Sequence, residues 1–487
     1  TWVLVCALAF APWLSSAQTG DVRPAGQQQP STTIPPRAES PTPTPSPTPL
    51  PPAPTVDIRP YRDEAGRIIG AALSDDTAYR RLAYLSDRIG HRLSGSPQLE
   101  QAIRWALEEM RRDGLERVRA EKVMVPHWVR GEESVELLEP AARRLVMLGL
   151  GGSVATPPEG ITAEAIVVRD FGELERLGER VRGKIVVYNV PFTNYRETVQ
   201  YRSSGASRAA RLGASAALIR SVGPTGRETP HTGSLRYDAD QPKIPAAALT
   251  AEGAETLARM QARGERVRLR LKMEARFLPD AESANVVAEW RGRERPEEVV
   301  LVSGHFDSWD VGHGAHDDGG GCLAAWEVLR LLKQLKLRPR RTIRVVLFTN
   351  EENGLRGANA YRDAHRAELP NHVLAIESDS GIFRPTGFGL DEKVSAQTRS
   401  NIREIAKLLS TIGADRIDPT GGGADIGPIM REGVAGMGLN VGGNYFEFHH
   451  TPADTFDKID PQDFALCVAT MAVMAYVAAD APARVDK

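Results

Sequence analysis

The chain contains little cysteine, with three such residues in 487. Cys6 lies in an apolar segment at the N-terminus, which leaves Cys322 and Cys467 for the folded part. Neither of them has the paired spacing of zinc-binding cysteines, so a cysteine-based metal site is not expected. The sequence leaves open whether these two thiols are free or form one disulfide.

The chain also has no large net charge and no long hydrophobic run. Its 61 Lys and Arg against 63 Asp and Glu give a net charge of −2, which argues against a nucleic-acid or acidic-membrane partner. The apolar runs 2–14 and 464–479 are short for a membrane span, and the second is expected to be a buried core helix. Gly319-Gly320-Gly321 is not followed by Lys-Ser/Thr, which excludes a phosphate-binding P-loop.

The first sixty residues have the composition of an export signal followed by a linker. The apolar run 2–14 followed by Ser15-Ser16-Ala17 predicts a signal peptide over 1–17, and hence a secreted or periplasmic protein. Residues 18–60 are rich in Pro, Thr and Ser and predict an extended linker without a core. The remaining length is enough for two folded domains.

Polar residues follow three short apolar runs in the second half of the chain. The runs 299–302, 342–348 and 373–376 are of the buried parallel-strand type, and residues 322–335 predict a helix between the first two. His305, the pair Glu351-Glu352 and Asp379 come directly after these runs. In open α/β sheets, ligands bind beyond the carboxyl ends of the strands, so these side chains are expected to meet.

The residue types in this pattern suit a two-metal hydrolytic site. Zinc takes imidazole and carboxylate ligands, and two ions can share a bridging carboxylate around an attacking water. Five ligands and one free carboxylate as a base are then required. The candidate ligands are His305, Asp317, Glu352, Asp379 and His450, and the candidate base is Glu351. His313 and His316 are expected to be loop residues, and Asp318 to hydrogen-bond the site.

Three segments, Gly304 to Asp310, Gly314 to Gly321 and His449 to Thr455, resemble the co-catalytic zinc aminopeptidase family, and the similarity covers roughly residues 65–475. The resemblance implies two zinc ions per chain, with Asp317 bridging them and Glu351 as general base. It implies that Asp307 orients His305, and that His450 rather than the adjacent His449 is the last ligand. It also suggests that Tyr445 and Asp425 line the cleft.

The resemblance further implies an α/β fold, in which a mixed central sheet is flanked by helices. The catalytic domain is expected over 61–124 and 276–487, with helices at 75–89 and 96–114. Residues 125–275 are expected to form an inserted β-rich domain similar to protease-associated domains. Its predicted elements are strands at 161–168, 183–188, 216–219 and 244–249 and a helix at 203–212.

The expected activity is hydrolysis of short peptides by a secreted dipeptidase or aminopeptidase. A glutamate-type carboxypeptidase is the first alternative, but the sequence places no basic group for a C-terminal carboxylate. A non-catalytic binding protein on the same fold is the second alternative. Glutaminyl cyclases of similar fold use one zinc and lack the full ligand set, which this chain keeps. Relatives are often dimers, so a homodimer is also allowed.

Overall fold

The computed structural model describes residues 51–487, so the predicted signal peptide and most of the predicted linker lie outside the described residues. The packed chain begins before Tyr61, where the sequence analysis placed its start. Val56 and Ile58 are buried in the main core, and the backbone N–H of Thr55 donates to Asn401 Oδ1 at 2.8 Å. Two apolar side chains between the last prolines are enough to anchor this end of the linker.

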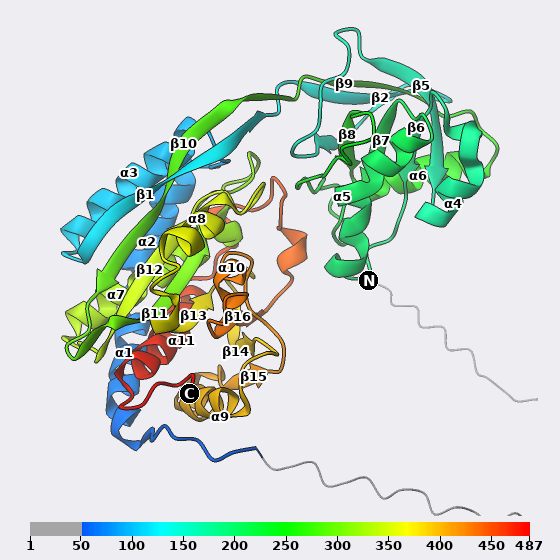
Figure 1. Cartoon of the computed structure of the whole chain (residues 1–487). Coiled ribbons are helices and arrows are strands. Elements are labelled where there is room, and N and C mark those ends of the chain that lie inside the picture. Colours follow the sequence, from blue (N-terminus) through cyan, green and yellow to red (C-terminus); the bar gives the residue numbers. More distant parts are fainter. Residues whose placement is uncertain (1–50) are drawn as a thin grey trace, which may run out of the picture. The chain divides into compact units, whose positions relative to one another are not determined.

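The first sheet has eight strands of mixed direction (Figure 1). β11 is parallel to both β12 and β13, whereas β10 is antiparallel to its neighbours. In spatial order the strands are β1 (Glu116–Val129), β10 (Arg276–Trp290), β12 (Arg341–Phe348), β11 (Arg295–His305), β13 (His372–Glu377), β16 (Gly436–Gly442), β14 (Arg384–Leu390) and β15 (Arg416–Asp418).

Helices cover both faces of this sheet because successive strand residues point to opposite sides. Val300 and Val302 of β11 join the larger core, while Leu301 joins a smaller core on the other face. The larger core receives α1 (Arg62–Ser74), α2 (Thr77–Tyr84), α3 (Pro97–Arg112), α7 (Gly320–Gln334), α9 (Ala396–Ala406) and α11 (Pro461–Asp480). The smaller core receives α8 (Arg356–Ala364) and α10 (Gly427–Met430). The predicted mixed α/β fold with flanking helices is confirmed.

α11 is a core helix. Among the described residues it is the one helix long and apolar enough to cross a membrane, but 83% of its apolar window is buried inside the protein. Cys467 of this helix and Cys322 of α7 are both buried and free, which answers the question that the sequence left open.

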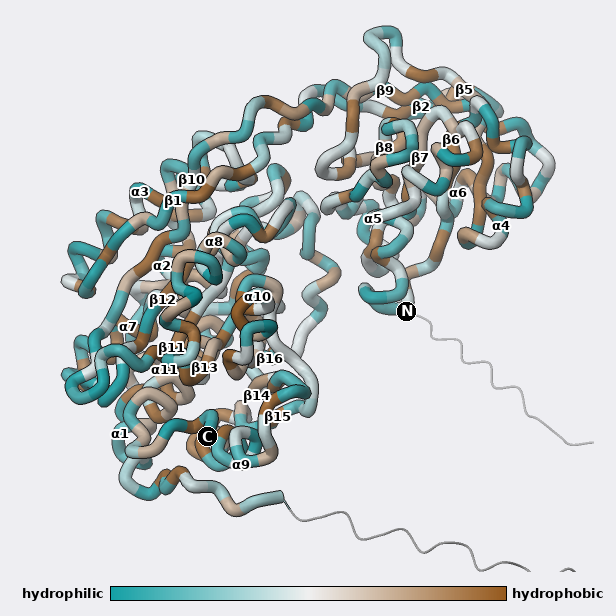
Figure 2. The backbone as a smooth tube through the Cα atoms, in the orientation of Figure 1, coloured by the Kyte–Doolittle hydropathy of each residue, from teal (hydrophilic) through white to brown (hydrophobic). Residues whose placement is uncertain are grey.

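Residues 133–273, here called the second-sheet segment, form another sheet of eight strands. α6 covers one face, and α4 and α5 cover the other. The brown, hydrophobic stretches in Figure 2 include the central strands of both sheets. In spatial order the strands are β3 (Arg143–Leu145), β2 (Glu133–Glu139), β9 (Arg268–Met273), β5 (Ile161–Val168), β6 (Ile185–Tyr188), β7 (Ala216–Arg220), β8 (Ala246–Leu249) and β4 (Met147–Gly149). The helices are α4 (Phe171–Leu177), α5 (Tyr195–Arg211) and α6 (Ala251–Ala262).

Candidate metal centre

The predicted site residues meet at one edge of the first sheet. His305 is the last residue of β11, the Glu351-Glu352 pair follows β12, and Asp379 follows β13. Asp317 lies in the turn before α7, and His450 lies in the loop after β16. All six side chains line a single cavity of about 760 Å³. The second-sheet segment contributes Phe192, Tyr195, Arg202 and Pro224 to its wall.

His305 is the centre of one group of donors. Its Nε2 lies 3.1 Å from Asp317 Oδ1 and 3.3 Å from Asp379 Oδ1. Its other ring nitrogen, Nδ1, lies 3.0 Å from the carbonyl oxygen of Asp307, to which it can donate. Burial opposes the charged form of this imidazole, but Asp379 and Asp317 outweigh it and raise the pKa of His305 well above its ordinary value. His305 Nε2 thus lies close to one oxygen of each of the two carboxylates.

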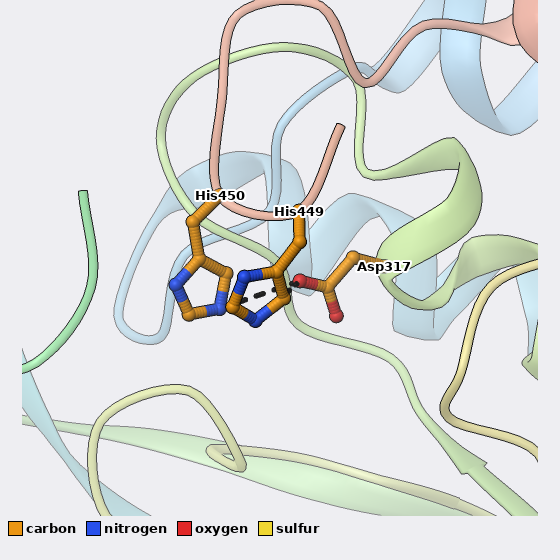
Figure 3. Close-up of side chains that lie close together, drawn as sticks. All are labelled: Asp317, His449 and His450. Atoms are coloured by element: carbon orange, nitrogen blue, oxygen red, sulfur yellow. Dashed lines mark ion pairs between the residues drawn. The ribbon is translucent and has the colours of Figure 1, made fainter. Parts of the chain in front are cut away.

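The second oxygen of Asp317 faces a different group. His450 Nε2 lies 3.3 Å from Asp317 Oδ2 and 3.0 Å from Glu352 Oε2. Figure 3 shows His449 and His450 together on one side of Asp317, and His449 Nε2 is 3.9 Å from Oδ2. Asp317 is thus placed between two donor groups, one at each of its oxygens. Of the two histidines, His450 is the one that contacts both carboxylates.

The chemistry of these donors fits zinc. Asp317 Oδ2 and Glu352 Oε1 are buried and accept no hydrogen bond within residues 51–487. A buried carboxylate oxygen without a partner is costly unless a cation neutralises it. Burial lowers the pKa of His450 well below its ordinary value, which keeps the imidazole neutral, as a metal ligand must be. Three groups of the described residues could hold a metal ion: His305 with Asp317 and Glu352, His305 with Asp318 and Asp379, and Asp317 with His449 and His450.

Glu351 differs from its neighbour Glu352. Its carboxyl group reaches the cavity, and no side-chain hydrogen bond to it is formed within the described part of the chain. Burial, reinforced by Asp379 and Asp307, raises the pKa of Glu351 to about 8. A carboxylate that gains a proton near neutral pH is suited to general acid–base catalysis.

Asp307 contacts both His305 and the Glu351-Glu352 pair, through different atoms. Its carboxylate does not hold the His305 ring, because Oδ1 lies 4.0 Å from His305 Nδ1. The two oxygens instead accept the backbone N–H groups of Glu351 at 3.0 Å and Glu352 at 3.3 Å. Asp307 therefore orients His305 through its backbone carbonyl and fixes the Glu351-Glu352 turn through its side chain.

Other buried charges hold the loops of the site. Asp318 accepts the backbone N–H groups of His305 and Gly321, each at 3.0 Å, as the predicted hydrogen-bonding role requires. Asp454 accepts the backbone N–H of Asp317 at 3.1 Å. Arg92 is fully buried and donates to the carbonyl oxygens of Gly90, Phe306, His313 and Gly314. The sequence analysis gave no role to Asp454 or Arg92, although Asp454 lies in the segment His449 to Thr455 that carries the family resemblance.

The sequence also suggested positions for Tyr445, Asp425 and His316. Tyr445 lines the cavity, whereas Asp425 is not part of the wall, which its neighbour Ala424 forms instead. His316 is a structural residue, as expected. It stacks between Phe383 and Phe448 and accepts the backbone N–H of Ile382 at 3.0 Å.

Comparison with known proteins identifies the family. Residues 285–475 match peptidase family M28. Carboxypeptidase Q of Bos taurus is 48% identical over 428 residues, which cover 87% of this chain and 90% of the relative. The chain belongs to peptidase family M28.

Solved structures of M28 relatives share the fold. A peptidase M28 precursor from Shewanella amazonensis SB2B has a TM-score of 0.85 at 33% identity, covering 88% of this chain and 98% of that one. A zinc aminopeptidase from Bacillus subtilis has a TM-score of 0.63 at 22% identity, covering 84% of this chain and 96% of that one, which shows the fold alone. The resemblance stated from the motifs and the expectation of a zinc-dependent exopeptidase are confirmed for this M28 chain.

Proposed function

We propose that this M28 chain is a secreted peptidase that holds two zinc ions and cleaves short peptides as a dipeptidase or aminopeptidase. The observation that carries the proposal is the position of Asp317, whose two carboxylate oxygens face two separate donor groups. A bridging carboxylate of this kind is what a two-metal hydrolytic site needs.

The donors divide naturally into two positions. His305, Asp379 and Asp317 Oδ1 would hold one zinc ion, and His450, Glu352 and Asp317 Oδ2 would hold the other. His450 is preferred to His449 because His450 alone of the two also lies beside Glu352. Each position then has three protein ligands and stays open to water or substrate, as in catalytic zinc sites.

Zinc bound by these groups would act as a Lewis acid and would make water nucleophilic near neutral pH. Glu351 would take a proton from a water in the cavity, since it lines the cavity and no side-chain hydrogen bond within the described residues occupies its carboxylate. The same carboxyl group then gives the proton to the leaving amine. Asp307 keeps Glu351 in position through the hydrogen bond to its backbone N–H.

The cavity wall favours a peptide with a free N-terminus over recognition of a C-terminal carboxylate. Among the described residues that line the cavity, Arg202 is the one Arg or Lys, and it already donates to Tyr195 Oη and to the carbonyl of Thr232. A carboxypeptidase would have to use this one guanidinium for the terminal carboxylate. Phe192 and Phe446 add an apolar surface for substrate side chains.

We also propose that residues 125–275 act as an inserted domain of the protease-associated type. The catalytic domain is then made of 61–124 and 276–487. β1 crosses the first of these boundaries, and the strands of the second sheet run from Glu133 to Met273. This insert would limit access to the cavity, since four of the lining residues belong to it.

The test combines metal content with a panel of dipeptides that are free, N-acetylated or C-amidated. We expect two zinc ions per chain and chelator-sensitive cleavage that requires a free amine but tolerates a C-terminal amide. Activity that is lost on amidation and indifferent to acetylation would establish the carboxypeptidase instead. Bound zinc without turnover of any peptide would support a binding protein on this fold.

A further inference from the structure

His450 has an unusual backbone conformation for a residue with a side chain. Its φ is +60°, in the left-handed region that residues other than glycine rarely adopt. Such a conformation persists only where the surroundings hold it. The backbone hydrogen bond that does so comes from the second-sheet segment, where the N–H of Thr232 donates to the carbonyl oxygen of His450 at 2.9 Å.

Arg202 of α5 reinforces this contact from behind. Its Nη1 donates to the carbonyl oxygen of Thr232 at 3.3 Å, and Nη2 donates to Tyr195 Oη at 2.8 Å. The same carbonyl oxygen lies 3.4 Å from His450 Nδ1 and can accept its N–H, as a histidine that binds metal through Nε2 requires. Arg202 therefore acts on His450 through the Thr232 carbonyl, with Nη1 itself 3.3 Å from Nδ1. The guanidinium is buried, and no carboxylate of residues 51–487 lies within ion-pair distance of it. Gly233 makes room for it, because a Cβ at that position would collide with the guanidinium.

Two further links attach the loop that carries His450. The ring of Phe446 stacks on Tyr195 with centroids 5.1 Å apart and lies 5.5 Å from Phe192. Glu447 forms an ion pair with Arg227. The loop is thus bound to the second-sheet segment through aromatic, ionic and backbone contacts within five residues.

The His305 group is held differently. The hydrogen bonds and ion pairs of the His305, Asp317 and Asp379 side chains, in the described part of the chain, involve no residue of 133–273. The loops of this group are fixed by Asp318, Asp454 and Arg92, which belong to the first-sheet part. The two donor groups therefore depend on different parts of the chain.

We infer that Arg202 is a positioning residue for His450, and that the zinc position formed by Glu352 and His450 depends on the second-sheet segment while the position centred on His305 does not. The inference rests on the proposed dizinc function. It implies that the two zinc positions differ in affinity, and that loss of the contacts from the second-sheet segment empties one of them first.

The test measures zinc binding to Arg202→Met in the full chain by titration calorimetry and by metal analysis after dialysis against a mild chelator. Removal of a group that orients a metal-binding histidine typically weakens binding about 10- to 100-fold. We expect the zinc affinity to fall by that factor at the position formed by Glu352 and His450. The affinity at the position centred on His305 should change by less than about twofold, so that dialysis leaves one zinc instead of two. Arg202→Lys, which keeps a donor, should recover part of the affinity.

Arg208→Met is the matched control, because Arg208 lies on the same helix, points to solvent and contacts Glu175 and Phe171. It should keep both zinc ions. Phe446→Leu weakens the contact between the His450 loop and the second-sheet segment without altering a buried charge. It therefore provides a second test if Arg202→Met does not fold. The inference would be overturned if both variants kept the wild-type zinc affinity at both positions. It would also be overturned if they lost affinity equally at both. A wild-type chain that binds fewer than two zinc ions would instead refute the proposed function.

Discussion

At the residue scale, two adjacent glutamates have different surroundings and are therefore assigned different roles. Glu351 and Glu352 follow the same strand, yet one carboxylate is free in the cavity and the other lies 3.0 Å from His450 Nε2. The sequence could predict that the pair belongs to the site, because it follows an apolar strand. It could not predict that Asp307 accepts both of their backbone N–H groups, since that contact spans 44 residues or more.

Replacement of Glu351 by Gln tests the base directly. The amide keeps the size of the side chain but cannot take a proton, and general acid–base catalysis typically contributes about 10²- to 10⁴-fold. We expect kcat to fall by at least that factor while metal analysis still finds the wild-type zinc content. Glu352→Gln is the matched comparison, and it should lose zinc as well as activity. Near-full activity in Glu351→Gln would exclude Glu351 as the base.

At the scale of elements, apolar strands and amphipathic or buried helices could both be predicted, and the helices predicted at 96–114 and 322–335 correspond to α3 and α7. The runs 299–302, 342–348 and 373–376 lie inside β11, β12 and β13, because buried parallel strands are continuously apolar. The helix predicted at 203–212 begins earlier in the structure, at Tyr195. Its first turns are polar and carry no apolar stripe, but Asn194 caps them by accepting the N–H of Glu197, a signal present in the sequence.

α11 should respond to substitution as a core helix does. Met471 is fully buried in the main core, so Met471→Ala removes apolar contacts and leaves a cavity. We expect the free energy of unfolding to fall by about 2–5 kcal/mol in denaturant titrations of the protein without detergent. Gln462→Ala, at an exposed position of the same helix, should change it by less than about 0.5 kcal/mol. A loss below about 1 kcal/mol for Met471→Ala would contradict the core assignment.

At the scale of the whole molecule, the site is assembled from contacts that no local pattern encodes. Arg92 reaches Phe306 across 214 residues, and Arg202 reaches His450 across 248. The motif spacing could predict which donors converge, because strand ends share one edge of a sheet. It could not predict which buried charges hold them, since a lone Arg in a loop or helix has no periodic signature.

Concentrated buried acids should make the metal-free protein sensitive to alkaline pH. Burial raises the pKa of Glu351 to about 8 and those of Glu377 and Asp454 to about 7, from ordinary values of 4.5 for Glu and 3.8 for Asp. Between pH 6.5 and 9 the native state therefore keeps protons that the unfolded chain has already lost, so stability falls as pH rises through this window. Below pH 6.5 the opposite effect sets in, because burial lowers the pKa of His316 to about 4 and that of His449 to about 3.

We expect the Tm of the metal-free chain to decrease steadily from pH 6.5 to 9 in thermal unfolding. Zinc-loaded protein should lose much less over the same range, because cations held by Asp317, Glu352 and Asp379 would favour the ionised form of the buried acids around them. Metal-free Glu351→Gln should show a shallower decrease than the wild type, since one of the buried carboxyls with a raised pKa is gone. A metal-free Tm that is constant or rises with pH in this window would mean that these acids are neutralised within the protein itself. The expectation that the buried acids around the site need a cation to balance their charge would then fail.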